Sequence, residues 1–305
     1  MPRPLSSILG QKGSCLSQPF ELVVPLLLLH CHSHTTTMSS SESLAVGVYK
    51  RDDTTVSRSP CPVVNALANH GYINRDGRKI YVRELNASMR RVGMSPLLGS
   101  VFAVPTYFEY HNPDTANKKD PVPTWQRVLS LIKNPYSYFD YFGCWNPEKM
   151  DDKGKKYVDL VDLASHGAIE HDVSMSRRDI GQKQGNNDPQ PDLIEDLLKH
   201  STDGEYLTIE EFGVFIKDRL KQQLEDNPDL VYGAHQHQLN CGNITLMMGC
   251  FGDGKKIPVK YVKAIFEDER LPIEEGWKRR FWWPMGLIEF FGSVRKVAKA
   301  TAMEF

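Results

Sequence analysis

A cysteine lies between two prolines at the start of a short predicted helix. Pro62 suits the first helical position, because it lacks only a donor that a helix start cannot use, and Gly71 supplies a left-handed stop. Cys61 is therefore predicted at the N-cap, where free backbone N–H groups and the helix dipole stabilise a thiolate. A thiolate there can ligate a metal, including heme iron. A buried structural cysteine is the alternative.

Three blocks of the chain resemble one known family. The first is Pro60-Cys61-Pro62 followed by Asn65-Ala66-Leu67-Ala68-Asn69-His70-Gly71-Tyr72-Ile73 and Asp76-Gly77-Arg78. The second is Ile169-Glu170-His171-Asp172-Val173-Ser174-Met175-Ser176-Arg177-Arg178-Asp179, and the third is Glu269-Arg270-Leu271-Pro272 with Gly276-Trp277. Together they resemble the fungal heme-thiolate peroxidases, the family of chloroperoxidase and the unspecific peroxygenases. The second block is similar to the branch with a Glu-His-Asp-x-Ser segment.

The resemblance implies an all-α fold, a single heme-binding helical domain of the chloroperoxidase type, with heme b as the cofactor. It implies that Cys61 ligates the heme iron. It further implies that Glu170, Asp172 and Ser174, together with a heme propionate, bind Mg²⁺, and that His171 orients a distal glutamate that moves the peroxide proton. Hard oxygen donors of this kind are what Mg²⁺ prefers.

The distal glutamate is where the chain departs from this pattern. Our alignment of the run from Gln236 to Ile244 places Asn240 at that position. An amide does not titrate, so it cannot act as a general base. Three explanations stay open: a substitute histidine, His237 or His235, moves the proton; peroxide cleavage is slow; or the heme serves other chemistry. We favour a substitute histidine, since a neutral imidazole can accept and return a proton.

The function that the resemblance implies is a peroxidase or peroxygenase that uses hydrogen peroxide. The resemblance implies a small hydrophobic organic substrate, with an aromatic molecule expected, and halide oxidation as a further reaction. Family members include tailoring enzymes of fungal secondary metabolism, which make polyketides and mycotoxins. The alternative is a heme- or metabolite-binding protein of the same fold that has lost peroxidase activity, which the Asn240 assignment motivates.

Composition narrows the classes of protein to consider. The 305 residues carry 37 basic and 38 acidic side chains, so no net field attracts nucleic acid, and we expect no nucleic-acid partner. An apolar content of 40% is sufficient for a core. The six cysteines show no paired short spacing, which argues against a zinc cluster and a dense disulfide framework.

The first 40 residues differ from the rest of the chain. We expect 1–40 to be a leader or disordered extension and 41–305 to be the heme-thiolate domain with an apolar C-terminal helix. The apolar run 23–29 is too short to span a bilayer. It also lacks a clean cleavage site after it, so we favour an intracellular protein and keep secretion as the alternative.

Helical periodicity dominates the remainder, and strand-like alternation is scarce. Helices are predicted near 62–70, 80–92, 124–132, 191–200, 208–224, 241–251, 258–268 and 285–299. Thr208 and Glu211 form a predicted capping box. An aromatic stripe that starts at Phe281 is flanked by Lys and Arg, an arrangement that can lie on a membrane surface. We favour packing against the domain or lining of its entrance for this stripe, with membrane association as the alternative.

Overall fold

The structure is a computed structural model that describes residues 44–51, 55–111, 136, 141–179, 182 and 187–302. All of them belong to one compact unit, Ser43–Phe305. The predicted leader and the predicted helix at 124–132 lie outside the described residues.

The described residues form a mainly helical structure, which confirms the predicted all-α class. Its α-helices are α1 (Pro62–Asn69), α2 (Val82–Met89), α3 (Pro96–Ala103), α5 (Pro191–Lys199), α6 (Ile209–Asp226), α7 (Ala234–Cys250), α8 (Val259–Phe266) and α9 (Leu287–Ala300). Short 3₁₀ helices are η1 (Arg90–Val92), η2 (Pro105–Tyr107) and η4 (Leu160–Ala164). The strands β1 (Tyr206–Thr208) and β2 (Lys256–Pro258) pair antiparallel, with Leu207 opposite Ile257.

Local sequence signals account for several helix boundaries. Pro62 begins α1 directly after Cys61, and Gly71 follows with a φ of 69°. Thr208 caps α6, with its hydroxyl accepting from the Glu211 N–H and the Glu211 carboxylate accepting from the Thr208 N–H. Two expectations were incomplete: α7 begins at Ala234, seven residues before the predicted start, and α3 was not predicted.

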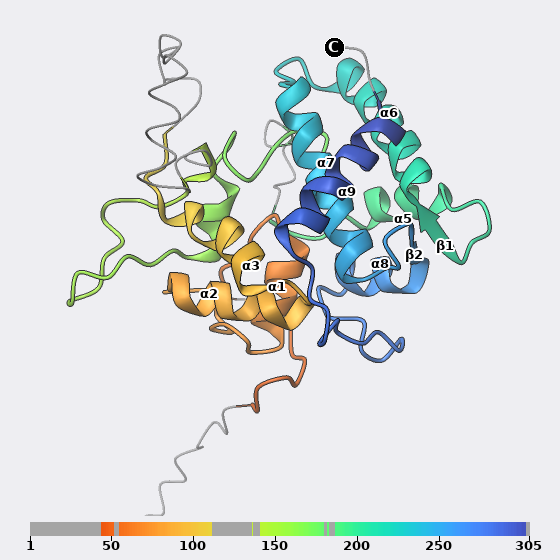
Figure 1. Cartoon of the computed structure of the whole chain (residues 1–305). Coiled ribbons are helices and arrows are strands. Elements are labelled where there is room, and N and C mark those ends of the chain that lie inside the picture. The colour runs from red at the N-terminus through yellow and green to blue at the C-terminus, as the bar shows by residue number, and fades with distance from the viewer. Residues whose placement is uncertain are drawn as a thin grey trace, which may run out of the picture. The chain divides into compact units, whose positions relative to one another are not determined.

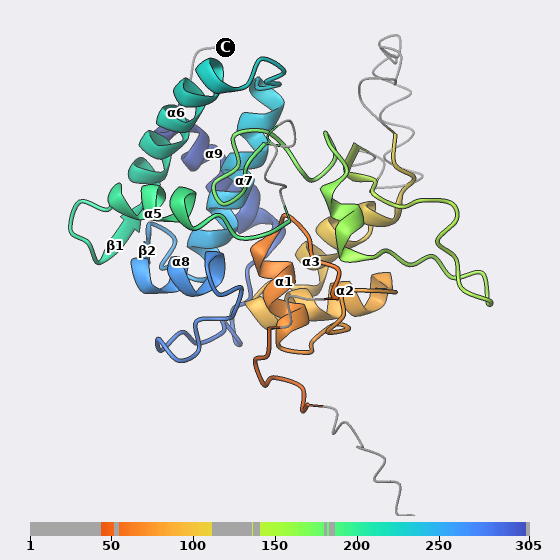
Figure 2. The ribbon, with the colours of Figure 1, turned by 180° about the vertical axis from the view of Figure 1, so that it is seen from behind.

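The helices form two groups. The two ribbon views place α2 and α3 beside α1 on one side, and α6, α7 and α9 together on the other (Figure 1, Figure 2). Within these groups α7 packs against α9 and α6, and α2 packs against α3. One hydrophobic cluster takes buried side chains from all of these helices, including Leu67, Leu85, Leu98, Phe212, Ile244 and Phe290.

No described helix combines the length and the apolar character that a membrane crossing would need.

A buried carboxylate joins the three sequence blocks. Glu269, from the third block, forms an ion pair of 2.5 Å with Arg177 in the second, and each side chain is 1% exposed. The same carboxylate accepts a hydrogen bond of 2.7 Å from the Asn65 side chain on α1. The Glu269 carbonyl accepts another, of 3.0 Å, from Asn69. Burial raises the pKa of Glu269 and lowers that of Arg177, and each partner opposes the shift of the other.

Removal of this carboxylate should be strongly destabilising. Glu269→Ala leaves the Arg177 guanidinium buried without its charge partner, so we expect a loss of about 3–5 kcal/mol in the free energy of unfolding. Denaturant titration followed by tryptophan fluorescence measures it. Glu195→Ala, which breaks the exposed pair with Lys199, is the control and should change stability by less than about 1 kcal/mol. Equal effects of the two variants would contradict the role assigned to Glu269.

Candidate active site

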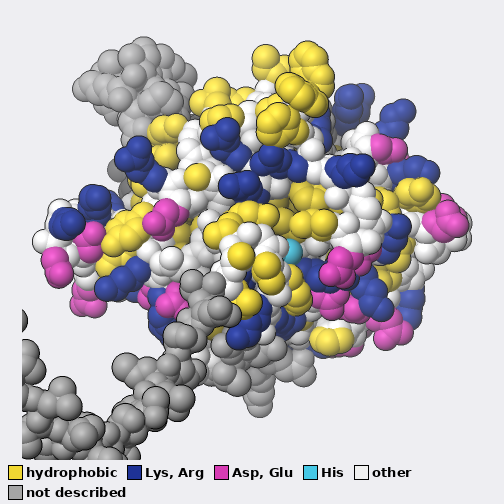
Figure 3. All heavy atoms as spheres, turned by 90° about the horizontal axis from the view of Figure 1, so that it is seen from below, with side chains coloured by type: hydrophobic (Ala, Val, Ile, Leu, Met, Phe, Trp, Pro, Cys, Tyr) yellow, Lys and Arg dark blue, Asp and Glu magenta, His cyan; other side chains and the backbone are white. Residues whose placement is uncertain are grey.

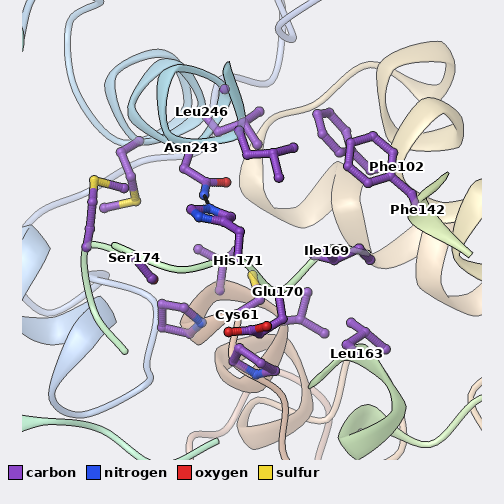
Figure 4. A pocket seen from close by; sticks show the side chains of 18 of the residues that line it. Cys61, Phe102, Phe142, Leu163, Ile169, Glu170, His171, Ser174, Asn243 and Leu246 are labelled. Carbon is purple, nitrogen blue, oxygen red and sulfur yellow. Dashed lines mark hydrogen bonds between the residues drawn. The ribbon is translucent and has the colours of Figure 1, made fainter. Parts of the chain in front are cut away.

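An apolar cavity lies between the two helix groups. Its lining comes from the start of α1, from α2 and α3, from the loop 169–177, and from α7 and α9. Figure 4 shows Cys61 and Glu170 deep in this cavity, His171 and Asn243 on one side, and Phe102 and Phe142 on another. Most of the lining is hydrophobic, and its few polar side chains include Glu170, His171, Arg177 and Asn243. A concave apolar site with a few convergent polar groups is typical of a ligand pocket.

Cys61 lies at the N-cap of α1, as predicted, and lines the cavity as a free thiol. Burial raises the pKa of the Cys61 thiol. The backbone N–H groups of Val64 and Val63 oppose this rise, and so does the positive charge of Arg177. Thus the helix start favours a thiolate as expected, but in the protein without a metal the loss of hydration outweighs it.

Hydrogen bonds from one asparagine hold the turn that carries Cys61. The Asn65 side chain accepts from the Ser59 N–H at 2.8 Å and donates to the Ser59 carbonyl at 2.8 Å. The Ser59 hydroxyl in turn accepts from the Cys61 N–H at 3.2 Å. Since Asn65 also donates to Glu269, the position of the thiol is linked to the buried ion pair.

The loop of the second block has a strained backbone that is held by a buried acid. Val173 has a φ of 59°, which is rare for a β-branched residue. Its N–H donates to the Asp179 carboxylate at 2.8 Å, and Asp179 lies 3.6 Å from Arg219 on α6. This conformation places Glu170, His171 and Ser174 on the cavity surface.

The structure brings together a group of possible metal ligands that contains the expected Glu170 and Asp172, with His166 in place of the expected Ser174. Ligand atoms of His166, Glu170 and Asp172 lie within 4.8 Å of one another. His166 Nδ1 is 2.7 Å from Glu170. One Asp172 oxygen accepts from the Val231 N–H at 2.9 Å, and the other is buried without a partner among the described residues. Burial raises the pKa of Asp172 to about 6. Ser174 lines the cavity from the same loop, but is not part of this group.

His171 is paired with an asparagine across the cavity surface. Its Nδ1 lies 2.9 Å from the Asp172 carbonyl, which can only accept, so Nδ1 carries the proton in the neutral ring. Its Nε2 then accepts from the Asn243 amide at 3.3 Å (Figure 4). Burial lowers the pKa of His171.

The structure corrects the residues expected on α7. Asn240 is buried away from the cavity and donates to the Val173 carbonyl at 3.1 Å. Asn243, one helical turn later, lies beside His171 instead. His237 is buried next to Cys241 and Thr301 and does not line the cavity, whereas His235 does.

Helical register explains these corrections and supplies the signal that was missed. The cavity face of α7 consists of residues that recur every three or four positions, namely His235, Gln238, Leu239, Gly242, Asn243, Leu246, Met247 and Cys250. Asn240 and His237 fall on other faces of the same helix. The assignment of Asn240 came from the alignment with the family and not from helical register. His166 was missed because it precedes the recognised block by one turn.

Comparison with known proteins agrees with this geometry. The family model described as "Peroxidase, family 2" matches residues 47–281. The chain belongs to this family. Its similar relatives include a protein named "Aromatic peroxidase fscJ" from Fusarium equiseti, 28% identical over 176 residues. They also include a protein named "Chloroperoxidase" from Leptoxyphium fumago, 32% identical over 135 residues.

Both matches are partial. They cover 58% and 44% of this member of peroxidase family 2, and 37% and 26% of the respective relatives. The matched segment is thus much shorter than either relative.

The hydrogen bonds of Asn65 should make a measurable contribution to the folded state. Asn65→Ala leaves the Ser59 N–H and carbonyl without their partners, so we expect a loss of about 2–4 kcal/mol, measured by denaturant titration. Asn74, an exposed asparagine that donates to the Arg78 carbonyl, offers a matched control. Asn74→Ala should change stability by about 0.5 kcal/mol or less. A loss for Asn65→Ala as small as that of the control would refute this account of the Cys61 turn.

Proposed function

We propose that this family member is a heme-thiolate peroxidase or peroxygenase in which Cys61 ligates heme iron. The observation that carries the proposal is the position of Cys61, a free thiol at a helix N-terminus that faces an apolar cavity beside a polar pair, His171 and Asn243. Heme bound through a thiolate supplies oxidation by peroxide, because the thiolate pushes electron density onto the iron and favours O–O cleavage.

The residues around the cavity fit such a group. Heme is a large, mostly apolar molecule, and the lining around Cys61 is mostly apolar. Backbone N–H groups of α1 and the Arg177 charge favour the thiolate form that a metal requires. Arg177 also keeps a buried Nε without a partner among the described residues, which suits a nearby anionic group.

The cavity suits a small hydrophobic, aromatic substrate. Phe102, Phe142, Phe290 and Phe291 are part of its lining, and aromatic rings favour offset or edge-to-face contact with another ring. The proposal extends, on the family resemblance, to oxidation within fungal secondary metabolism and to halide oxidation.

We propose that His171, oriented by Asn243, transfers the peroxide proton, and that no carboxylate is needed for this step. His171 Nε2 carries the lone pair at the cavity surface, and the Asn243 amide holds it there. His235 is eight residues from Asn243 on the same helix, about 12 Å along the axis, which makes it a poorer candidate. His171 would accept the proton of hydrogen peroxide at Nε2 once the Asn243 amide releases that lone pair, and it would return the proton to the leaving oxygen.

Besides heme, the protein is expected to bind a divalent cation. We propose that Glu170 and Asp172 hold Mg²⁺, with Ser174 as the expected third side chain. The unpartnered, buried Asp172 oxygen supports a cation there. His166 is hydrogen-bonded to Glu170, so it would orient this ligand.

The test of the proposed function is turnover. The full chain loaded with heme, given hydrogen peroxide and an electron-rich aromatic substrate, should oxidise that substrate. Cys61→Ala should reduce the rate to that of free heme, whereas Cys144→Ala, which changes a buried thiol outside the cavity, should leave it unchanged. Heme-loaded protein without turnover would overturn the enzyme assignment and favour the alternative of a heme-binding protein.

The proton assignment predicts unequal effects of two histidines. His171→Gln should lower the rate of reaction with peroxide about 10²–10⁴-fold, as removal of a positioned acid–base group does, whereas His235→Gln should have little effect. Asn243→Glu, which places a titratable acid beside His171, should raise the rate about tenfold or more. Stopped-flow absorbance measures these rates. If His235→Gln caused the larger loss, His235 would be the proton acceptor.

A further inference from the structure

The loop before α9 exposes three large aromatic side chains. Phe281 is 64% exposed, Trp282 is 83% and Trp283 is 82%. The Arg279 guanidinium lies 5.0 Å from the Phe281 ring centre, and Phe281 meets Trp282 edge to face at 5.2 Å. The packing that we favoured for this part of the stripe is therefore wrong, although Met285 and Phe290 further along are buried.

This loop is fixed at both ends. Before it, Trp277 is buried and its indole N–H donates to the Cys250 carbonyl at 2.9 Å. After it, Met285 is 1% exposed. Within it, Arg280 forms two hydrogen bonds with Glu289 on α9, of 2.7 and 3.1 Å. A loop held in this way presents its aromatic side chains outward at little further conformational cost.

The outer face of α9 extends the same surface. Ile288 is 93% exposed, and Gly292, Arg295 and Lys299 follow it at intervals of three or four residues, all exposed. The opposite face packs inward through Phe290 and Val297. The outer face is thus apolar at the start of the helix and cationic toward its end.

The charge of this region contrasts with that of the chain. Between residues 278 and 300 there are six Lys and Arg side chains and a single carboxylate, Glu289, whereas the whole chain has a net charge of −1. Seen from below, large hydrophobic side chains project at one edge of the molecule next to Lys and Arg side chains (Figure 3). We call residues 278–283 and the outer face of α9 the aromatic–basic patch.

We propose that the aromatic–basic patch docks on a membrane surface that contains anionic lipid. Exposed Trp side chains favour the boundary between headgroups and acyl chains, where the ring is apolar and its N–H stays hydrated. Lys and Arg beside them are attracted to anionic headgroups, each strengthening binding about fivefold. A second copy of this chain is a poorer occupant, because a symmetric contact through the patch would bring two sets of cations together.

The test is co-sedimentation of the full chain with vesicles of phosphatidylcholine alone and of phosphatidylcholine with phosphatidylserine. We expect binding to the anionic vesicles only, reduced by added salt. The double variant Trp282→Ala/Trp283→Ala should weaken it about tenfold or more. Lys296→Gln/Lys299→Gln should weaken it as well. Leu224→Ala, at a side chain 69% exposed on α6, is the matched control and should bind like the unchanged protein.

Several outcomes would overturn the proposal. These are no binding to anionic vesicles, equal binding to both kinds of vesicle, or binding that the two tryptophan substitutions leave unchanged. A dimer in light scattering that the double variant converts to monomer, without vesicle binding, would show that a second copy covers the patch. All of these measurements are made without heme, so they are separate from the test of the proposed function.

Discussion

The arrangement of the cavity depends on one buried ion pair, between Glu269 and Arg177. Its two charges come from segments 92 residues apart, and a third segment reaches the pair through Asn65 on α1. A buried charge is costly unless it is paired and hydrogen-bonded, so the three segments are stable only when they meet. The same asparagine fixes the turn before Cys61. The requirement to satisfy buried charge therefore positions the Cys61 thiol.

On the opposite side of the cavity, a second buried acid and arginine hold the loop that carries His171. Asp179 and Arg219 hold the loop on which Val173 takes a left-handed conformation, and that loop places His171 at the cavity surface. Beside His171, the Asn243 side chain is an amide that hydrogen-bonds to the imidazole. An amide can hold the imidazole in one orientation but cannot itself exchange protons. In the proposed mechanism the histidine consequently has a more direct part than the family resemblance implies.

The sequence was sufficient for features that local chemistry determines. Pro62 and Gly71 delimit α1, and Cys61 lies at the N-cap of α1 as predicted. Thr208 and Glu211 cap α6. The start of α7 was not predictable in the same way, because residues 234–240 are mostly polar and Gly233 is a weak cap. The alignment with the family alone selected Asn240, whereas the register of the whole helix places Asn243 on the cavity face and Asn240 on another. The partnership of Glu269 with Arg177 depends on tertiary contact, which no local pattern encodes.

The central claim is that Cys61 provides the axial ligand of a heme iron. The most direct test is the absorption spectrum of the heme-loaded, reduced protein under carbon monoxide, recorded for the unchanged chain and for Cys61→Ala. The account predicts the red-shifted Soret band of a thiolate-ligated heme in the unchanged chain and its loss in the variant. A band typical of a histidine ligand, or a thiolate band that survives the substitution, would contradict it.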